Sequence, residues 1–160
     1  MIEPWFKTAL MYWGVDEIPG PDDNQIIIDW FKWVKIQGPL HDEIPNCSAG
    51  LNAFFGLNGI KGTESPLAQS WLNWGIILDN PKLQCVCILK SLKNNWQGHC
   101  GILCAFNFKS IVLFGCNQDN NTNFKIYDKS LVLGYRWPKL EYYNNYTKPF
   151  SSPSRLYDQY

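Results

Sequence analysis

Apolar residues in the first half of the chain recur every three or four positions, a spacing that is typical of amphipathic helices. Polar and glycine- or proline-rich stretches separate these segments, which indicates loops. The spacing predicts four helices, over residues 4–13, about 24–36, from near Cys47 to about Gly59, and a short one within 64–75. The first half of the chain is therefore expected to be helical.

The second half consists of short apolar and β-branched runs, separated by turns rich in Asn, Gly, Lys and Asp. Such runs predict strands, here over residues 83–90, 99–106, 110–117, 123–127 and 131–137. Helices followed by strands indicate an α+β domain with an antiparallel sheet of about five strands, rather than alternating βαβ units. We expect the domain to span residues 1–138, and residues 139–160, rich in Tyr, Asn, Ser and Pro, to form a tail.

The composition narrows the classes of function. The 160 residues carry 14 Lys and Arg against 14 Asp and Glu, so the formal net charge is zero and no nucleic-acid partner is expected. No apolar run is long enough to predict stable insertion into a membrane. The N-terminus lacks the pattern of a secretory signal, so we expect synthesis in a reducing cytoplasm, where the six cysteines are thiols, metal ligands or a nucleophile rather than disulfides.

Cys47 differs from the other five cysteines in its position. It lies in the stretch "EIPNCSAGLNAFFG" at a predicted helix start, whereas the others fall within predicted strands. The free N–H groups and the dipole of a helix start lower the pKa of a thiol, and the N–H groups of Cys47 or Ser48 are candidates for an oxyanion hole. The chain has two histidines, His41 in a polar loop and His99 at a strand start. Cys47 and His99 are therefore the candidate nucleophile and base.

A polar side chain should orient the imidazole of His99. Its identity depends on the loop of the hairpin predicted around residue 108. A loop of an odd number of residues, such as 107–109, places Asn117 opposite His99, whereas a loop of four residues places Gln118 there. The count of loop residues therefore does not decide whether Asn117 or Gln118 orients His99.

Several other side chains could have a functional role or a purely structural one. The cysteines of the strands could form a zinc cluster, but their spacing does not fit paired C-x-x-C motifs, so we expect core packing and neither metal nor cofactor. A disulfide between Cys100 and Cys116 after export stays open. The candidates for contacts with a substrate are two tryptophans, two acidic residues that precede Cys47, and one amide, namely Trp74, Trp96, Asp42, Glu43 and Gln118.

Five fragments occur along the chain in this order: "ALMYWGVDEIPGPDDN", "DEIPNCSAGLNAFFGLNGIKGTESPLAQSWLNWG", "GHCGIL", "LFGCNQDNNTNFKIY" and "LVLGYRWP". In order and spacing they resemble a group of small bacterial and phage cysteine hydrolases, similar to the CHAP and NlpC-type cell-wall enzymes of the papain-like superfamily. The resemblance covers roughly residues 4–138.

The resemblance implies a Cys-His-Asn set made of Cys47, His99 and Asn117, and so favours Asn117 over Gln118. The chain departs from the pattern of the family around each of these positions. Asn46 stands where the family tends to have Trp, Cys100 replaces Val, Cys116 replaces Gly, and "QCVCIL" at 84–89 replaces a Gly-Asp strand entry.

The resemblance implies a papain-like hydrolase that cleaves an amide bond of peptidoglycan by thiol acyl transfer. The bond would be the N-acetylmuramoyl-L-alanine link or one within the stem or cross-link peptides. It further implies action in the periplasm or cell wall after delivery by a holin or a secretion system, and an immunity protein as a partner. Two alternatives stay open: a papain-like effector that acts on a protein, and a non-catalytic module that binds cell wall or glycan.

Overall fold

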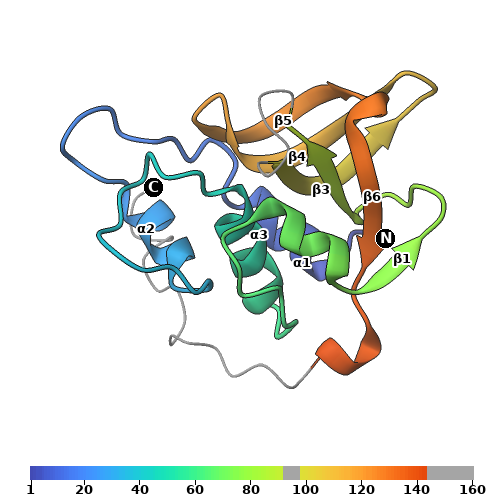
Figure 1. The fold of residues 1–160 in the computed structure, drawn as a ribbon, viewed down its shortest axis with the longest axis horizontal. Coiled ribbons are helices and arrows are strands. Elements are labelled where there is room, and N and C mark those ends of the chain that lie inside the picture. Colours follow the sequence, from blue (N-terminus) through green and yellow to red (C-terminus); the bar gives the residue numbers. More distant parts are fainter. Residues whose placement is uncertain (92–97, 144–160) are drawn as a thin grey trace.

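The computed structural model describes residues 1–91 and 98–143, and its helices gather on one side of an antiparallel sheet (Figure 1). The helical elements are α1 (Pro4–Leu10), α2 (Gln25–Phe31), α3 (Cys47–Gly56) and the 3₁₀ helix η1 (Ala68–Asn73). Helices that precede a sheet and pack on it make an α+β fold, as the order of the patterns in the sequence predicts.

The sheet has six strands in the order β1-β6-β2-β3-β4-β5, and all of its pairs are antiparallel. The strands are β1 (Ile76–Leu78), β2 (Val86–Lys90), β3 (Gly98–Phe106), β4 (Ser110–Gln118), β5 (Asn121–Asp128) and β6 (Val132–Trp137). Two short 3₁₀ helices, η2 (Lys129–Leu131) and η3 (Leu140–Tyr142), precede and follow β6.

The elements differ from the sequence prediction mainly in length. The second helix ends at Phe31 because the hydrogen bonds beyond it reach back three residues instead of four, as in Val34 N–H to Phe31 O. The fourth predicted helix is a 3₁₀ helix over Ala68–Asn73. The prediction missed β1, which has three residues and too little alternation to produce a signal.

Helix α3 forms the centre of the molecule, because all ten of its residues are buried. It contacts α1, α2 and strands β3 and β4. At Gly50 the helix comes so close to the sheet that a Cβ atom would overlap Sγ of Cys116. The glycine therefore sets the separation between α3 and β4.

The two faces of the sheet have separate apolar clusters. The face toward the helices holds Val86, Ile88, Cys100, Ile102, Phe114 and Cys116, and the alternate positions, among them Cys85, Cys87, Leu89 and Leu103, form the second cluster. All six cysteines are free thiols. In residues 1–91 and 98–143, no group of three or more Cys, His, Asp or Glu side chains is placed to hold a metal ion.

The folded unit extends beyond the predicted boundary at residue 138. Lys61 N–H donates to the carbonyl oxygen of Tyr142, Ile60 forms a β-bridge with Tyr143, and both tyrosines pack against the main core. The rest of the predicted tail, residues 144–160, lies outside the described residues.

The contact at Gly50 gives a prediction about stability. An alanine in a helix is more favourable than glycine by about 1 kcal/mol, but at position 50 its methyl group would overlap Cys116 Sγ. We expect Gly50→Ala to lower the free energy of unfolding by about 1–3 kcal/mol in urea denaturation. In a Cys116→Ala background the same substitution should cost less, and an equal cost in both backgrounds would contradict this contact.

Candidate active site

Cys47 is the first residue of α3, and the fold fixes the start of this helix from several sides. The Ser48 hydroxyl donates to Ser65 O at 2.7 Å and accepts from Trp71 Nε1 at 3.0 Å. Asn52 Nδ2 donates to Ser48 O at 2.8 Å. These hydrogen bonds hold the first turn of the helix in place. The backbone N–H groups of Cys47 and Ser48 lie in this turn and have no acceptors within the helix.

The thiol of Cys47 meets two side chains of β3. The thiol of Cys100 and the imidazole of His99 are the neighbours that lower the pKa of the Cys47 thiol. The hydrogen bond from Cys100 lowers the pKa of Cys47, burial opposes it, and the hydrogen bond and charge of His99 lower it again. The net result is a thiol whose pKa lies well below the ordinary value.

The other five cysteines have raised pKa values. Burial raises the pKa of Cys85 to about 11 and that of Cys104 to about 12, and it also raises the pKa values of Cys87, Cys100 and Cys116. Cys47 is therefore the one thiol of six whose pKa is lowered, and its neighbours Cys100 and His99 are the cause.

Gln118 holds the far side of the His99 ring, with Oε1 3.0 Å from Nε2. The amide orientation is fixed because Gln118 Nε2 donates to Asn123 O at 2.6 Å, which leaves the oxygen toward the imidazole. An amide oxygen only accepts, so His99 Nε2 carries a proton. The other nitrogen, Nδ1, is then the one available to the thiol of Cys47.

Asn117 does not orient His99, which corrects the choice that the family resemblance favours. Its Nδ2 donates to Glu17 Oε1 at 2.5 Å, and its backbone has a φ of 57°. Four residues separate the paired residues Phe106 and Ile111, but a register shift between Leu103 and Ala105 follows this pair.

A second register irregularity, between Gly115 and Gln118, includes the left-handed Asn117. It directs the Asn117 side chain toward Glu17 and the Gln118 side chain toward His99. The loop length does not reveal that two register shifts follow along the strands. The loop length alone therefore could not decide whether Asn117 or Gln118 faces His99.

Two residues that support this site were missed at the level of sequence. Tyr127 OH donates to Gln118 Oε1 at 3.0 Å, and the ring of Tyr127 lies 5.5 Å from that of His99. Asn123 accepts from the Gln118 amide and returns a hydrogen bond to Gln118 O at 3.0 Å. The alternation of "NFKIY", which puts 123, 125 and 127 on one face, was the available signal.

Gly115 leaves room for the imidazole. A methyl group at this position would lie 3.2 Å from His99 Nε2 and 3.4 Å from Gln118 Oε1. The absence of a side chain at residue 115 therefore allows the ring to sit over β4 within reach of Gln118.

Among the described residues, two of the predicted substrate contacts, Trp74 and Gln118, have other roles. Trp74 is a core residue, with its ring packed on Phe55, Trp71 and Tyr142 and its Nε1 bonded to Lys61 O. Trp96 lies outside the described residues. Gln118 is buried and positions His99, so its predicted role in substrate binding is corrected.

The two predicted acidic residues differ in burial. Asp42 is 1% exposed, and its Oδ2 accepts from the backbone N–H groups of Ile18 and Asn24, so it organises a loop. Glu43 is exposed. The carboxyl of Glu17, bonded to Asn117, has a raised pKa because of burial and because Asp42 and Glu43 add negative charge.

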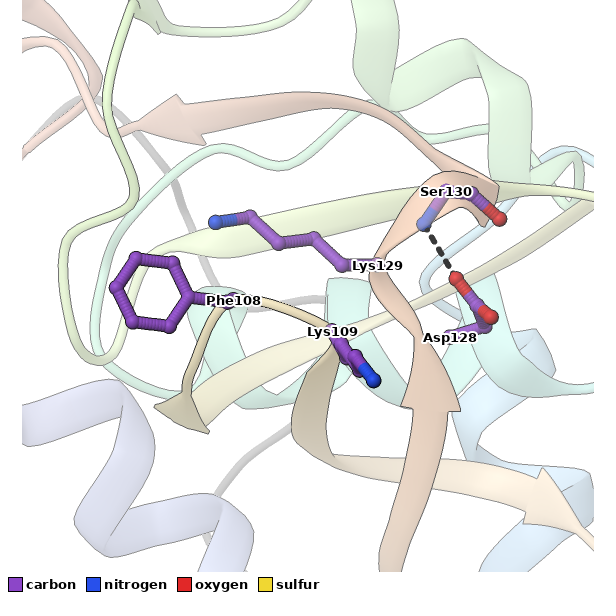
Figure 2. A pocket seen from close by; sticks show the side chains of 5 residues that line it. All are labelled: Phe108, Lys109, Asp128, Lys129 and Ser130. Atoms are coloured by element: carbon purple, nitrogen blue, oxygen red, sulfur yellow. Dashed lines mark hydrogen bonds between the residues drawn. The ribbon is translucent and has the colours of Figure 1, made fainter.

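The far end of the β3–β4 hairpin has a surface hollow without such chemistry. Phe108, Lys109, Asp128, Lys129 and Ser130 line it, and Ser130 N–H donates to the Asp128 carboxylate (Figure 2). His99 lies near the opposite end of β3, so this hollow is separate from the thiol. Among the described residues, no helix has the length and apolar character needed to span a membrane.

Comparison of the chain with protein-family models and with curated proteins gives no significant match. The candidate site therefore rests on its geometry: a thiol at a helix start, an imidazole in contact with it, and an amide behind the imidazole.

The lowered pKa of Cys47 predicts selective alkylation. At a pH near 7, limited iodoacetamide should modify Cys47 before the other five cysteines, because the thiolate is the reacting species. Peptide mapping by mass spectrometry measures the modified fraction at each cysteine. In a His99→Ala variant the selectivity for Cys47 should fall, and equal labelling of all six cysteines in the wild type would contradict the assignment.

The position of Gln118 predicts the tautomer of His99. In ¹⁵N NMR of the wild type, the neutral ring should carry its proton on Nε2. Gln118→Ala should produce a mixture of both neutral tautomers, whereas the neighbouring Asn117→Ala should leave the spectrum unchanged. A tautomer shift in Asn117→Ala and none in Gln118→Ala would reverse the assignment.

Proposed function

We propose that the protein is a cysteine hydrolase with a papain-like arrangement that cleaves an amide bond in peptidoglycan. The observation that carries the chemistry is the contact of the Cys47 thiol with His99, whose Nε2 is held by Gln118. A thiol of lowered pKa next to an oriented imidazole is the arrangement that acyl transfer to cysteine requires. The choice of peptidoglycan rests on the resemblance of five sequence fragments to CHAP and NlpC-type enzymes.

The reaction has two halves. His99 Nδ1 takes the proton of Cys47, and the thiolate attacks the amide carbonyl to form a tetrahedral intermediate. His99 then protonates the departing amine, which leaves a thioester on Cys47. Water, deprotonated by the same imidazole, hydrolyses the thioester and regenerates the thiol.

The start of α3 supplies the groups that stabilise the negative charge of the intermediate. The backbone N–H of Cys47 or Ser48 is the candidate donor to the oxyanion, because the first helical turn leaves these groups without intrahelical acceptors. The hydrogen bonds of the Ser48 side chain to Ser65 and Trp71 hold this turn in place before substrate binds.

The substrate bond is either the N-acetylmuramoyl-L-alanine amide or an amide within the stem or cross-link peptides. Glu43 is the exposed acidic residue near the start of α3, and the Glu17 carboxyl lies within its electrostatic reach. Negative charge at this side would suit an amino group of a stem peptide. Action on the cell wall would follow delivery by a holin or a secretion system, and an immunity protein would protect the producing cell.

Digestion of purified peptidoglycan sacculi tests this proposal. We expect the wild type to release fragments with new amine ends, identified by mass spectrometry, and Cys47→Ala to lower the rate by at least about 10³-fold because the nucleophile is lost. Cys116→Ala is the matched control, since it removes another buried thiol of the same cluster.

The outcomes separate the alternatives. Equal release by the wild type and Cys47→Ala would contradict Cys47 as the nucleophile. No release by either, with cleavage or deamidation of a protein substrate that depends on Cys47, would contradict peptidoglycan and favour a protein-directed effector. Binding to sacculi without any Cys47-dependent chemistry would favour a non-catalytic binding module.

A further inference from the structure

The tip of the β3–β4 hairpin exposes two aromatic side chains to water. Phe108 is 100% exposed, and Phe106, the last residue of β3, is 43% exposed. The proposed hydrolysis uses neither residue. Because exposed apolar side chains that lie close together are typical of interaction surfaces, the tip is a candidate for contact with a partner.

Hydrogen bonds fix the backbone on both sides of Phe108. Asn107 Oδ1 accepts from the backbone N–H groups of Lys109 and Ser110, both at 2.8 Å. Asn107 N–H donates to Ser110 O at 2.9 Å, and Lys129 N–H donates to Lys109 O at 2.8 Å. Phe108 therefore projects into water from an ordered turn, and a partner would not have to order this turn on binding.

Two lysines flank the aromatic rings. Lys129 Nζ lies 5.8 Å from the centre of the Phe106 ring, and Lys109 directly follows Phe108. The side chain of Lys129 extends to the side of the hollow on which Phe108 lies (Figure 2). In the part of the chain that the structure describes, neither ammonium group has a carboxylate at salt-bridge distance. The tip therefore combines apolar rings with unpaired positive charge.

Asp128 is the acidic residue of the hollow beside the tip. Its carboxylate accepts from Ser130 N–H at 2.8 Å, and it lies across the hollow from Phe108 (Figure 2). Two lysines line the same hollow, so positive charge exceeds negative charge there. The whole chain has a formal net charge of zero, so this excess of positive charge is local.

We propose that the hairpin tip, residues 106–109 together with Lys129, docks on the surface of a membrane that contains anionic phospholipids. Phe108 enters the boundary between the headgroups and the acyl chains, and the ammonium groups of Lys109 and Lys129 lie at the lipid phosphates. The inference goes beyond the proposed hydrolysis and does not depend on it, since it requires neither Cys47 nor a cell-wall substrate.

The chemistry of the tip favours a membrane over other partners. A soluble polyanion would bind the lysines but would leave the ring of Phe108 in water. A second copy of the chain, related by a twofold axis through the tip, would bring lysines against lysines. An anionic bilayer offers a negative surface and an apolar interior together, and docking at this boundary requires no membrane-spanning helix.

Sedimentation of the full chain with lipid vesicles tests the proposal. The wild type should bind vesicles of phosphatidylglycerol and phosphatidylcholine at least about 10-fold more tightly than vesicles of phosphatidylcholine alone, and added salt should weaken this binding. Phe108→Ser should lower the partition coefficient for the mixed vesicles at least about 10-fold, because the ring no longer leaves water. Lys109→Gln combined with Lys129→Gln should lower it about 25-fold, since each lysine near an anionic surface contributes about fivefold.

Control variants change similar groups elsewhere on the surface. Ile77→Ser removes an exposed apolar side chain of β1, and Lys7→Gln combined with Lys35→Gln removes two exposed lysines. Both variants should bind the mixed vesicles like the wild type. Cys47→Ala should also bind like the wild type, which separates a failure of this proposal from a failure of the proposed hydrolysis.

Four results would overturn the proposal: no binding of the wild type to the mixed vesicles, equal binding to both kinds of vesicle, an equal loss in the control and tip variants, or an unchanged partition coefficient in Phe108→Ser. Two further results would overturn it in favour of another partner. Binding of polyphosphate that needs the lysines, without binding of vesicles, would identify a soluble polyanion. Self-association in analytical ultracentrifugation that disappears in Phe108→Ser would identify a second copy of the chain.

Discussion

The approach of helix α3 to strands β3 and β4 is the contact on which the candidate site depends. Gly50 allows the helix to lie against Cys116, and one turn earlier Cys47 reaches His99 and Cys100. Hydrogen bonds from Ser48 and Asn52 then fix the helix start along its axis. A separation wider by one methyl group would take the thiol away from the imidazole, because reacting groups need hydrogen-bonding distance.

The pKa of the Cys47 thiol is set by opposing effects, those of its neighbours and that of burial. Burial alone raises the pKa of a thiol, as it does for the other five cysteines. At Cys47 the interactions with Cys100 and His99 lower the pKa by more than burial raises it. The imidazole is able to do this because Gln118 and Tyr127 hold its far side, and burial raises the pKa of Tyr127, which keeps its hydroxyl a donor.

The sequence predicted the α+β class and most strands, because helix starts and strand alternation are local signals, and the scarcity of histidine made His99 the candidate partner of Cys47. It did not determine the orienting amide, since Gln118 reaches His99 only through two register irregularities and a residue with φ of 57°. It placed Trp74 and Asp42 at a substrate surface, but burial depends on contacts between distant segments such as Trp74 with Tyr142. Irregular pairing and tertiary burial leave little trace in a single sequence.

The central claim is that the pKa of Cys47 lies well below that of an ordinary thiol, and ultraviolet absorbance of the thiolate tests it most directly. A lowered pKa means that the anion is present above that pKa and disappears as the pH falls through it. The wild type minus Cys47→Ala should therefore show one thiolate that persists below the ordinary thiol pKa of about 8.5 and is lost only at more acidic pH. A difference that appears only above about pH 8.5 would contradict the account.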